Sequence, residues 1–137
     1  MIEMMSDDYH LDHAFYIDIL QKITNELNIN GNIVIKVGDK DESQQLNRDF
    51  LQRDYPTDVL SFTFNEELPD GFYLGDIFVC YPIAEEQAKE NHISLEEELL
   101  ILMIHGLLHL AGYDHEAEND SGEMLTLQKR LVKKVLP

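Results

Sequence analysis

The sequence predicts an α+β fold, in which helices pack on a small mixed β-sheet around one central helix. Two observations support this prediction. Segments with helical periodicity and short β-rich runs follow one another in the order α-β-α-β-β-α-α-α. The most apolar of these segments, within residues 94–115, carries its aliphatic side chains on all sides, so the helix it forms is expected to be buried at the centre.

The first half of the chain alternates helix and strand. Residues 10–28 carry apolar side chains at helical spacing, and a turn rich in Asn and Gly follows. Residues 33–37 (IVIKV) are short and β-branched, which is typical of a strand. Residues 41–51 open with two acids, as a helix N-terminus favours. After Pro56, residues 59–64 alternate as a second strand.

An acidic stretch separates the second predicted strand from the third. Residues 65–72 (NEELPDGF) carry turn signals and are expected to form a loop. Residues 73–81 (YLGDIFVCY) are the longest strand candidate in the chain. Pro82 suits the first position of a helix that runs to about residue 91.

The last two helices follow closely. Ser94 with Glu97 three residues later forms a capping box, which fixes where the central helix starts. Its expected core residues are aliphatic: Leu99, Leu100, Leu102, Met103 and Leu107. Residues 120–135 have an apolar stripe and are expected to form the final helix. Near its end stand four bases that complement the helix dipole and are also the best candidate patch for RNA: Lys129, Arg130, Lys133 and Lys134.

Composition favours one domain over residues 1–137 in a reducing compartment. A chain of 137 residues that is 44% hydrophobic can bury a real core. The single cysteine, Cys80, cannot form an intrachain disulfide. The N-terminus is acidic, unlike a signal peptide, and the longest aliphatic run, 99–104, is too short to span a membrane. We therefore expect a cytoplasmic protein with no membrane contact; its oligomeric state is not predicted.

The charge balance argues against a general nucleic-acid binder. Acids outnumber bases 27 to 10, which gives a net charge of −17. Proteins that bind nucleic acid through phosphates normally carry an excess of Lys and Arg. Any RNA contact must therefore come from a local basic patch, from a bound metal, or from docking on a larger partner.

Three histidines stand at the end of the central helix, in the pattern H-x-x-x-H-x-x-G-x-x-H. His105 and His109 are four residues apart and so share one helix face. Gly112 suits the left-handed backbone at a helix C-terminus, after which His115 can return toward the other two. Three imidazoles with one position left to water are typical of a catalytic zinc site. We expect one Zn²⁺ per chain, although other divalent transition metals also accept imidazole.

The spacing matches that of the metzincin proteases in every position but one. Those enzymes carry Glu after the first His as general base, whereas this chain has Gly106. The run HGLLHLAGYDH instead resembles the signature of the YbeY endoribonuclease family, the bacterial rRNA maturation factors, which is H-G-x-L-H-L-x-G-Y-D-H. The run PTDVLSF, residues 56–62, resembles a second signature of the same family.

The resemblance covers most of residues 40–127 and implies a function. It implies a zinc-dependent, single-strand-specific endoribonuclease that acts in rRNA maturation, near the 3′ end of 16S rRNA, and in ribosome quality control. The expected partners are single-stranded rRNA and the ribosome or its proteins. The chemistry agrees, because a divalent metal lowers the pKa of its bound water toward ~7 and polarises a phosphoryl oxygen.

Further site residues follow from the residues and the resemblance together. Asp114 can orient a ligand histidine or take a proton. Thr57 and Asp58 suit turn chemistry by themselves, and only the resemblance suggests that they support the site. Asp76 is an acid within an apolar strand, in a Gly-Asp-Ile that the family also carries; it either braces the site or faces solvent.

One position departs from the family pattern. Family members usually carry an Arg in the segment after the 41–51 helix, where this chain has Leu51. The nearest base is Arg53, which becomes the candidate for stabilising phosphoryl charge. The alternative role for Arg53 is a surface ion pair with Asp49 or Asp54.

Two other functions fit parts of the sequence. A metal-stabilised ribosome-assembly factor without turnover is consistent with the acidic charge, since such a protein can dock on basic ribosomal proteins. A metallopeptidase shares the histidine spacing but lacks the Glu at Gly106, so we expect no peptide cleavage.

Overall fold

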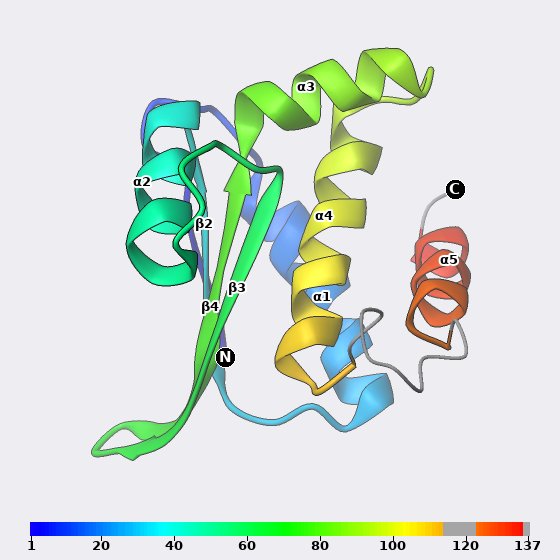
Figure 1. Ribbon diagram of the computed structural model, residues 1–137. Helices are drawn as coiled ribbons and strands as arrows, with labels where there is room; N and C mark the ends of the chain where they lie inside the picture. The colour runs from blue at the N-terminus through cyan, green and yellow to red at the C-terminus, as the bar shows by residue number, and fades with distance from the viewer. Residues whose placement is uncertain (114–122, 136–137) are drawn as a thin grey trace.

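The computed structural model describes residues 1–113 and 123–135. They form a four-stranded mixed sheet with helices on both faces, which confirms the predicted α+β class (Figure 1). The elements, in chain order, are β1 Ile2–Met5, α1 His13–Leu27, β2 Asn32–Gly38, α2 Lys40–Leu51, β3 Val59–Leu68, β4 Gly71–Cys80, α3 Tyr81–Glu90, α4 Leu95–Leu110 and α5 Glu123–Val135. None of the helices in these ranges is both long and apolar enough to cross a membrane.

The sheet has one strand more than the sequence predicts. Its order is β1-β2-β4-β3, with β1 parallel to β2, β2 parallel to β4, and β3 antiparallel to β4. The unpredicted strand is β1, in which Ile2 and Met4 are buried and the residues between face solvent. In a segment of four residues, alternation of apolar and polar side chains cannot be distinguished from chance. A strand this short is not stable alone, and its pairing with β2 stabilises it.

The predicted loop at residues 65–72 is wrong, because most of it extends the β3–β4 hairpin. Glu66 pairs with Tyr73, and Leu68 pairs with Gly71. In the last six residues of β3 the side chains on both faces of the strand are exposed. The sequence therefore shows no alternation of apolar and polar residues there. Backbone hydrogen bonds to β4 are enough to hold it as a strand. The hairpin therefore projects beyond the helices, as Figure 1 shows at the lower left.

The two faces of the sheet carry separate apolar clusters. On one face α2 packs over Leu60, Phe78 and Cys80. On the other face α1 and α4 build the main core, and α5 lies outside α4 (Figure 1). The predicted core residues of α4 are all buried: Leu99, Leu100, Leu102, Met103 and Leu107. This arrangement places α4 at the centre and leaves one of its sides to line cavities beside β3 and α5.

Both ends of α4 follow the local sequence signals. Ser94 Oγ accepts a hydrogen bond from the Glu97 amide at 3.1 Å, which caps the N-terminus as predicted. At the other end Gly112 has φ +99°, the left-handed region that its position requires. The helix thus ends just after His109, with the chain turning back over its C-terminal carbonyls.

The contact between α4 and the sheet depends on a glycine in β4. A Cβ at Gly75 would lie 2.3 Å from the Phe62 carbonyl oxygen and 2.7 Å from Leu110 Cδ2. We therefore expect Gly75→Ala to lower the free energy of unfolding by roughly 2 kcal/mol or more, because a backbone atom cannot move aside cheaply. Thr63→Ala, at the exposed partner position on β3, should change it by less than about 0.5 kcal/mol. Chemical denaturation of both variants tests this; equal midpoints would contradict it.

Candidate metal centre

His105 and His109 lie together on the last turns of α4, as their spacing predicts. Their Nε2 atoms are 3.2 Å apart, and both side chains are half-buried. The rings meet edge to face, with centroids 4.7 Å apart. Because the helix fixes both backbones, the two ring nitrogens converge on one point without needing a loop to order.

A glutamine on α5 orients the first of these rings. Gln128 Oε1 lies 2.9 Å from His105 Nδ1. When this nitrogen carries the proton and donates to the amide oxygen, Nε2 keeps its lone pair and faces His109. Nothing in the local sequence marks Gln128, since it stands 23 residues from His105. It is the outer partner that metal-binding histidines usually have.

The donor set fits a divalent metal. Two nitrogens bound to one tetrahedral ion at 2.0–2.1 Å each would stand about 3.3 Å apart, close to the observed Nε2 separation. The third predicted ligand, His115, and the predicted proton acceptor, Asp114, both lie outside the described residues. Within residues 1–113 and 123–135, no three His, Cys, Asp or Glu side chains gather as a complete ligand set. Residues 1–113 and 123–135 therefore supply no third ligand next to His105 and His109.

Gly106 packs directly on the sheet. A Cβ there would lie 2.7 Å from Ile77 Cγ2, on β4, and 3.2 Å from Ser61 Oγ. The Ser61 hydroxyl also donates to the Gly106 carbonyl at 3.3 Å. The position that holds the general base in metzincins thus serves here for close packing of α4, with no room for a carboxylate side chain.

Asp58 stands at the start of β3 and lines a cavity together with His105. The Val59 amide donates to Asp58 Oδ1 at 2.7 Å, and the Thr57 hydroxyl donates to the same atom at 3.4 Å. Ser43, on α2, holds the Thr57 backbone through two hydrogen bonds of 2.7 and 2.9 Å. Asp58 therefore borders the site, and Thr57 helps to hold it there.

Asp76 does not brace the histidines. It pairs with Phe62 across β3 and β4 and lines a cavity on the α2 face. Ile77, the next residue, points into the core under α4. Since successive side chains of a strand point to opposite faces, Asp76 lies on the far side of the sheet from α4. Its partner there is the Tyr73 hydroxyl, which donates to it.

Glu98 is a feature of the site that the sequence reasoning missed. It lies two turns before His105 on α4, is only 5% exposed, and borders the same cavity as His105, Gln128 and Asp58. Within the described residues no group donates a hydrogen bond to its Oε2 atom. Burial, followed by the nearby charges of Asp58 and Glu97, raises the pKa of the Glu98 carboxyl.

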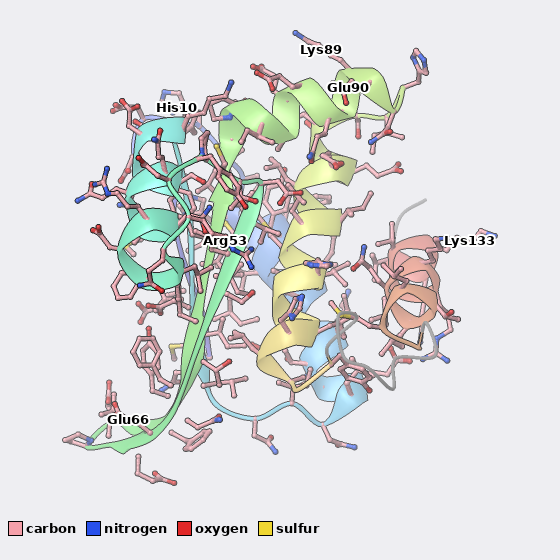
Figure 2. The ribbon with its side chains drawn as sticks, in the orientation of Figure 1. His10, Arg53, Glu66, Lys89, Glu90 and Lys133 are labelled. Carbon is pink, nitrogen blue, oxygen red and sulfur yellow. The ribbon has the colours of Figure 1, made fainter. Side chains whose placement is uncertain are left out.

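Two roles are predicted for Arg53, a phosphoryl contact or a surface ion pair, and the described residues bear on the second. The Asp49 and Asp54 carboxylates both lie near Arg48, at 3.4 and 3.7 Å. Arg53 is exposed and has no ion pair among the described residues. In the view of Figure 2 it lies between α2 and α4. Within these residues Arg53 forms no ion pair with Asp49 or Asp54, and its role toward a phosphoryl group stays a prediction.

Comparison with known proteins gives a consistent result over the whole chain. The family model described as Endoribonuclease YbeY matches residues 2–136. A protein of that name from Sulfurihydrogenibium sp. is 41% identical over 88% of this chain and 82% of its own length. Another, from Thermotoga petrophila, is 46% identical over 86% of this chain and 74% of its own. A third, from Persephonella marina, is 38% identical over 93% and 86%.

A solved structure agrees with the sequence matches. The solution structure of TM1509 from Thermotoga maritima has a TM-score of 0.67 and 36% identity, and covers 98% of this chain and 89% of that one. Fold, histidine motif and sequence identity thus point to the same group of proteins, and the chain belongs to the YbeY endoribonuclease family.

Proposed function

We propose that this protein is a zinc-dependent endoribonuclease that cleaves single-stranded RNA, acts in maturation of the 16S rRNA 3′ end and contributes to ribosome quality control in the cytoplasm. The observation that carries the proposal is the pair of imidazole Nε2 atoms 3.2 Å apart, with the His105 ring held through its other nitrogen, Nδ1, by Gln128. The printed name shared by its relatives, Endoribonuclease YbeY, supports RNA as the substrate.

Different residues of the chain have different roles in the proposed hydrolysis of RNA. His105 and His109 would hold one Zn²⁺, with His115, from the sequence after α4, as the third ligand. The chemistry available from that ion is activation of water and polarisation of a phosphoryl oxygen. Hydrolysis forms a bond from water oxygen to phosphorus and breaks the bond to the leaving nucleotide oxygen, which takes up a proton from solvent. Asp114, next to His115 in sequence, accepts the proton released by the water.

Arg53 supplies positive charge to the phosphoryl group. An exposed guanidinium with no carboxylate partner in residues 1–113 and 123–135 is available to a phosphate, which it can bind through two parallel hydrogen bonds. We expect Arg53→Ala to lower RNA cleavage at least tenfold, about 1.4 kcal/mol of barrier. Arg48→Ala is the matched control, because it removes a cation five residues away, at the end of α2, that already has carboxylate partners. Cleavage by Arg53→Ala within twofold of wild type would reject this role.

A basic groove beside the histidines offers a path for the RNA backbone. It has a volume of about 860 Å³ and lies between α4 and α5. Three of the ten basic residues of this acidic chain line it: Lys129, Arg130 and Lys133. Figure 2 shows Lys133 on α5. Gln128 borders both this groove and the cavity that contains His105, so a strand bound along α5 would pass next to the histidines.

Removing charge from this groove tests the path. We expect Lys129→Gln/Lys133→Gln to weaken binding of single-stranded RNA by metal-free protein and to reduce the slope of log affinity against log salt by about 1.4, or about 0.7 per lost contact. Lys40→Gln/Arg48→Gln makes the same change in net charge on α2, where both side chains have acidic partners. Equal effects of the two double variants would mean that only net charge matters.

The function itself is tested by incubating zinc-loaded protein with single-stranded and duplex RNA of the same sequence. We expect cleavage of the single strand, and loss of that cleavage in His109→Ala. The main alternative, a metal-stabilised assembly factor that docks on basic ribosomal proteins, is favoured by the net charge of −17. Binding to ribosomal particles without cleavage of any RNA would support that alternative.

A further inference from the structure

We propose that the cavity containing Glu98 is a nucleobase pocket, in which Glu98 reads the hydrogen-bond donors of a base next to the cleaved phosphodiester, with guanine as the best ligand. This inference rests on the proposed function, because it assigns a place to one base of the RNA. The cavity has a volume of about 360 Å³ and lies between the end of α3, the start of β3 and one side of α4.

The Glu98 carboxyl presents a buried acceptor atom that no described residue satisfies. A carboxyl group that is 5% exposed loses most of its hydration, yet its Oε2 has no donor among the described residues. Leaving a buried polar atom unsatisfied costs roughly 1–3 kcal/mol, so such an atom calls for an explanation. Asp58 differs, because the Val59 amide and the Gln87 side chain donate to it. Glu98 is thus the acceptor that remains for a bound molecule.

The surroundings favour a base over a metal ion. No set of three carboxylate or imidazole ligands gathers here within residues 1–113 and 123–135. Aliphatic side chains line the cavity beside the acids and offer surfaces for the faces of a flat ring: Val59, Ile101 and Leu102. Amide side chains that can both donate and accept lie at its rim: Gln87, Asn91 and Gln128. Apolar walls with a few polar groups are the usual composition of a pocket for a small planar ligand.

Guanine matches the acceptor. Its N1–H and N2–H₂ groups stand side by side and can both donate to one carboxylate, whereas cytosine and adenine offer only an amino group. Paired contacts of this kind give the largest discrimination between bases. A single-stranded substrate is required, because these donors are occupied in a duplex.

The position of the cavity suits a base next to the cleaved bond. Glu98 precedes His105 by seven residues, so it lies about 10 Å away along the axis of α4. A nucleotide spans a comparable distance from its phosphate to the edge of its base. Figure 2 shows Glu90, another residue of this cavity, on α3 above α4, at the end away from the histidines. A phosphate held at the histidines would therefore leave its base able to reach Glu98.

Binding of short oligonucleotides to metal-free protein tests the pocket. The probe is a labelled single-stranded oligouridine with one guanosine at each position in turn, and the same series with inosine, which lacks the N2 amino group. For the best position we expect about tenfold tighter binding of guanosine than inosine. Glu98→Gln keeps the side-chain shape and should abolish the difference between guanosine and inosine.

Controls separate this proposal from its rivals. Glu96→Gln makes the same charge change at an exposed position of α4 and should keep the preference for guanosine. Equal affinity for guanosine and inosine in wild type, or a preference that survives Glu98→Gln, would overturn the pocket. Tighter binding on addition of Mg²⁺ that is lost in Glu98→Gln, without base preference, would identify a cation site and also overturn it. Cleavage without base preference would refute only the pocket; guanosine-selective binding without cleavage would refute only the nuclease.

Discussion

Replacing His105 and His109 together with alanine is expected to remove zinc from the protein and to abolish RNA cleavage. The two Nε2 atoms are 3.2 Å apart on one rigid helix, so the pair forms the fixed part of the site. Loss of both should lower metal affinity by far more than the roughly 10- to 100-fold that loss of an outer partner causes. Metal analysis of protein purified without a tag, with zinc expected at one ion per chain in wild type, measures this directly.

The control for this experiment is a second pair of histidines. His10 and His92 are both exposed, and Figure 2 shows His10 at the opposite end of the molecule from the end of α4. His10→Ala/His92→Ala also removes two histidine side chains and should leave the metal content at wild-type level. Equal metal content in the two double variants would show that the zinc is bound elsewhere.

Gln128→Leu is expected to lower zinc affinity about tenfold or more, although Gln128 does not contact the metal. Its Oε1 atom is 2.9 Å from His105 Nδ1, and leucine offers no acceptor. In the Leu variant, no acceptor stabilises the His105 tautomer that carries its proton on Nδ1 and keeps the Nε2 lone pair for the metal. Competition with a chelator of known affinity measures the change, and proton-detected NMR of the imidazole reports the tautomer.

A conservative variant distinguishes this positioning role from simple packing. Gln128→Glu replaces the amide oxygen with a carboxylate, which accepts the Nδ1–H more strongly, so it should keep or raise the affinity for zinc. If Gln128→Glu loses as much affinity as Gln128→Leu, the side chain acts only by filling space between α5 and α4.

The sequence predicted the elements that carry strong local signals. The N-cap at Ser94, the glycine after α4 and the aliphatic core of α4 all follow from spacing alone, and the structure confirms them. The edges of the sheet were not predictable in this way. β1 is four residues long, and the end of β3 is exposed on both sides, so pairing with a neighbouring strand determines each of them.

The site was predictable where chemistry and spacing coincide, and not where side chains meet from distant elements. His105 and His109 follow from a helical repeat. The contact of Gln128 with His105 depends on how α5 packs against α4, which no local pattern encodes. The face on which Asp76 lies depends on which side of the sheet α4 covers, and that is decided by tertiary packing. Glu98 looked like one of several acids in the first turn of a helix, and only its burial separates it from them.

Titration of metal-free protein with zinc, followed by cleavage of single-stranded RNA at each step, tests the central claim most directly. If His105, His109 and His115 form one catalytic centre, cleavage rises linearly and stops rising at one zinc per chain. The His109→Ala protein, titrated in parallel, stays inactive throughout. Full cleavage by the chelated wild-type protein before any zinc is added would contradict the account.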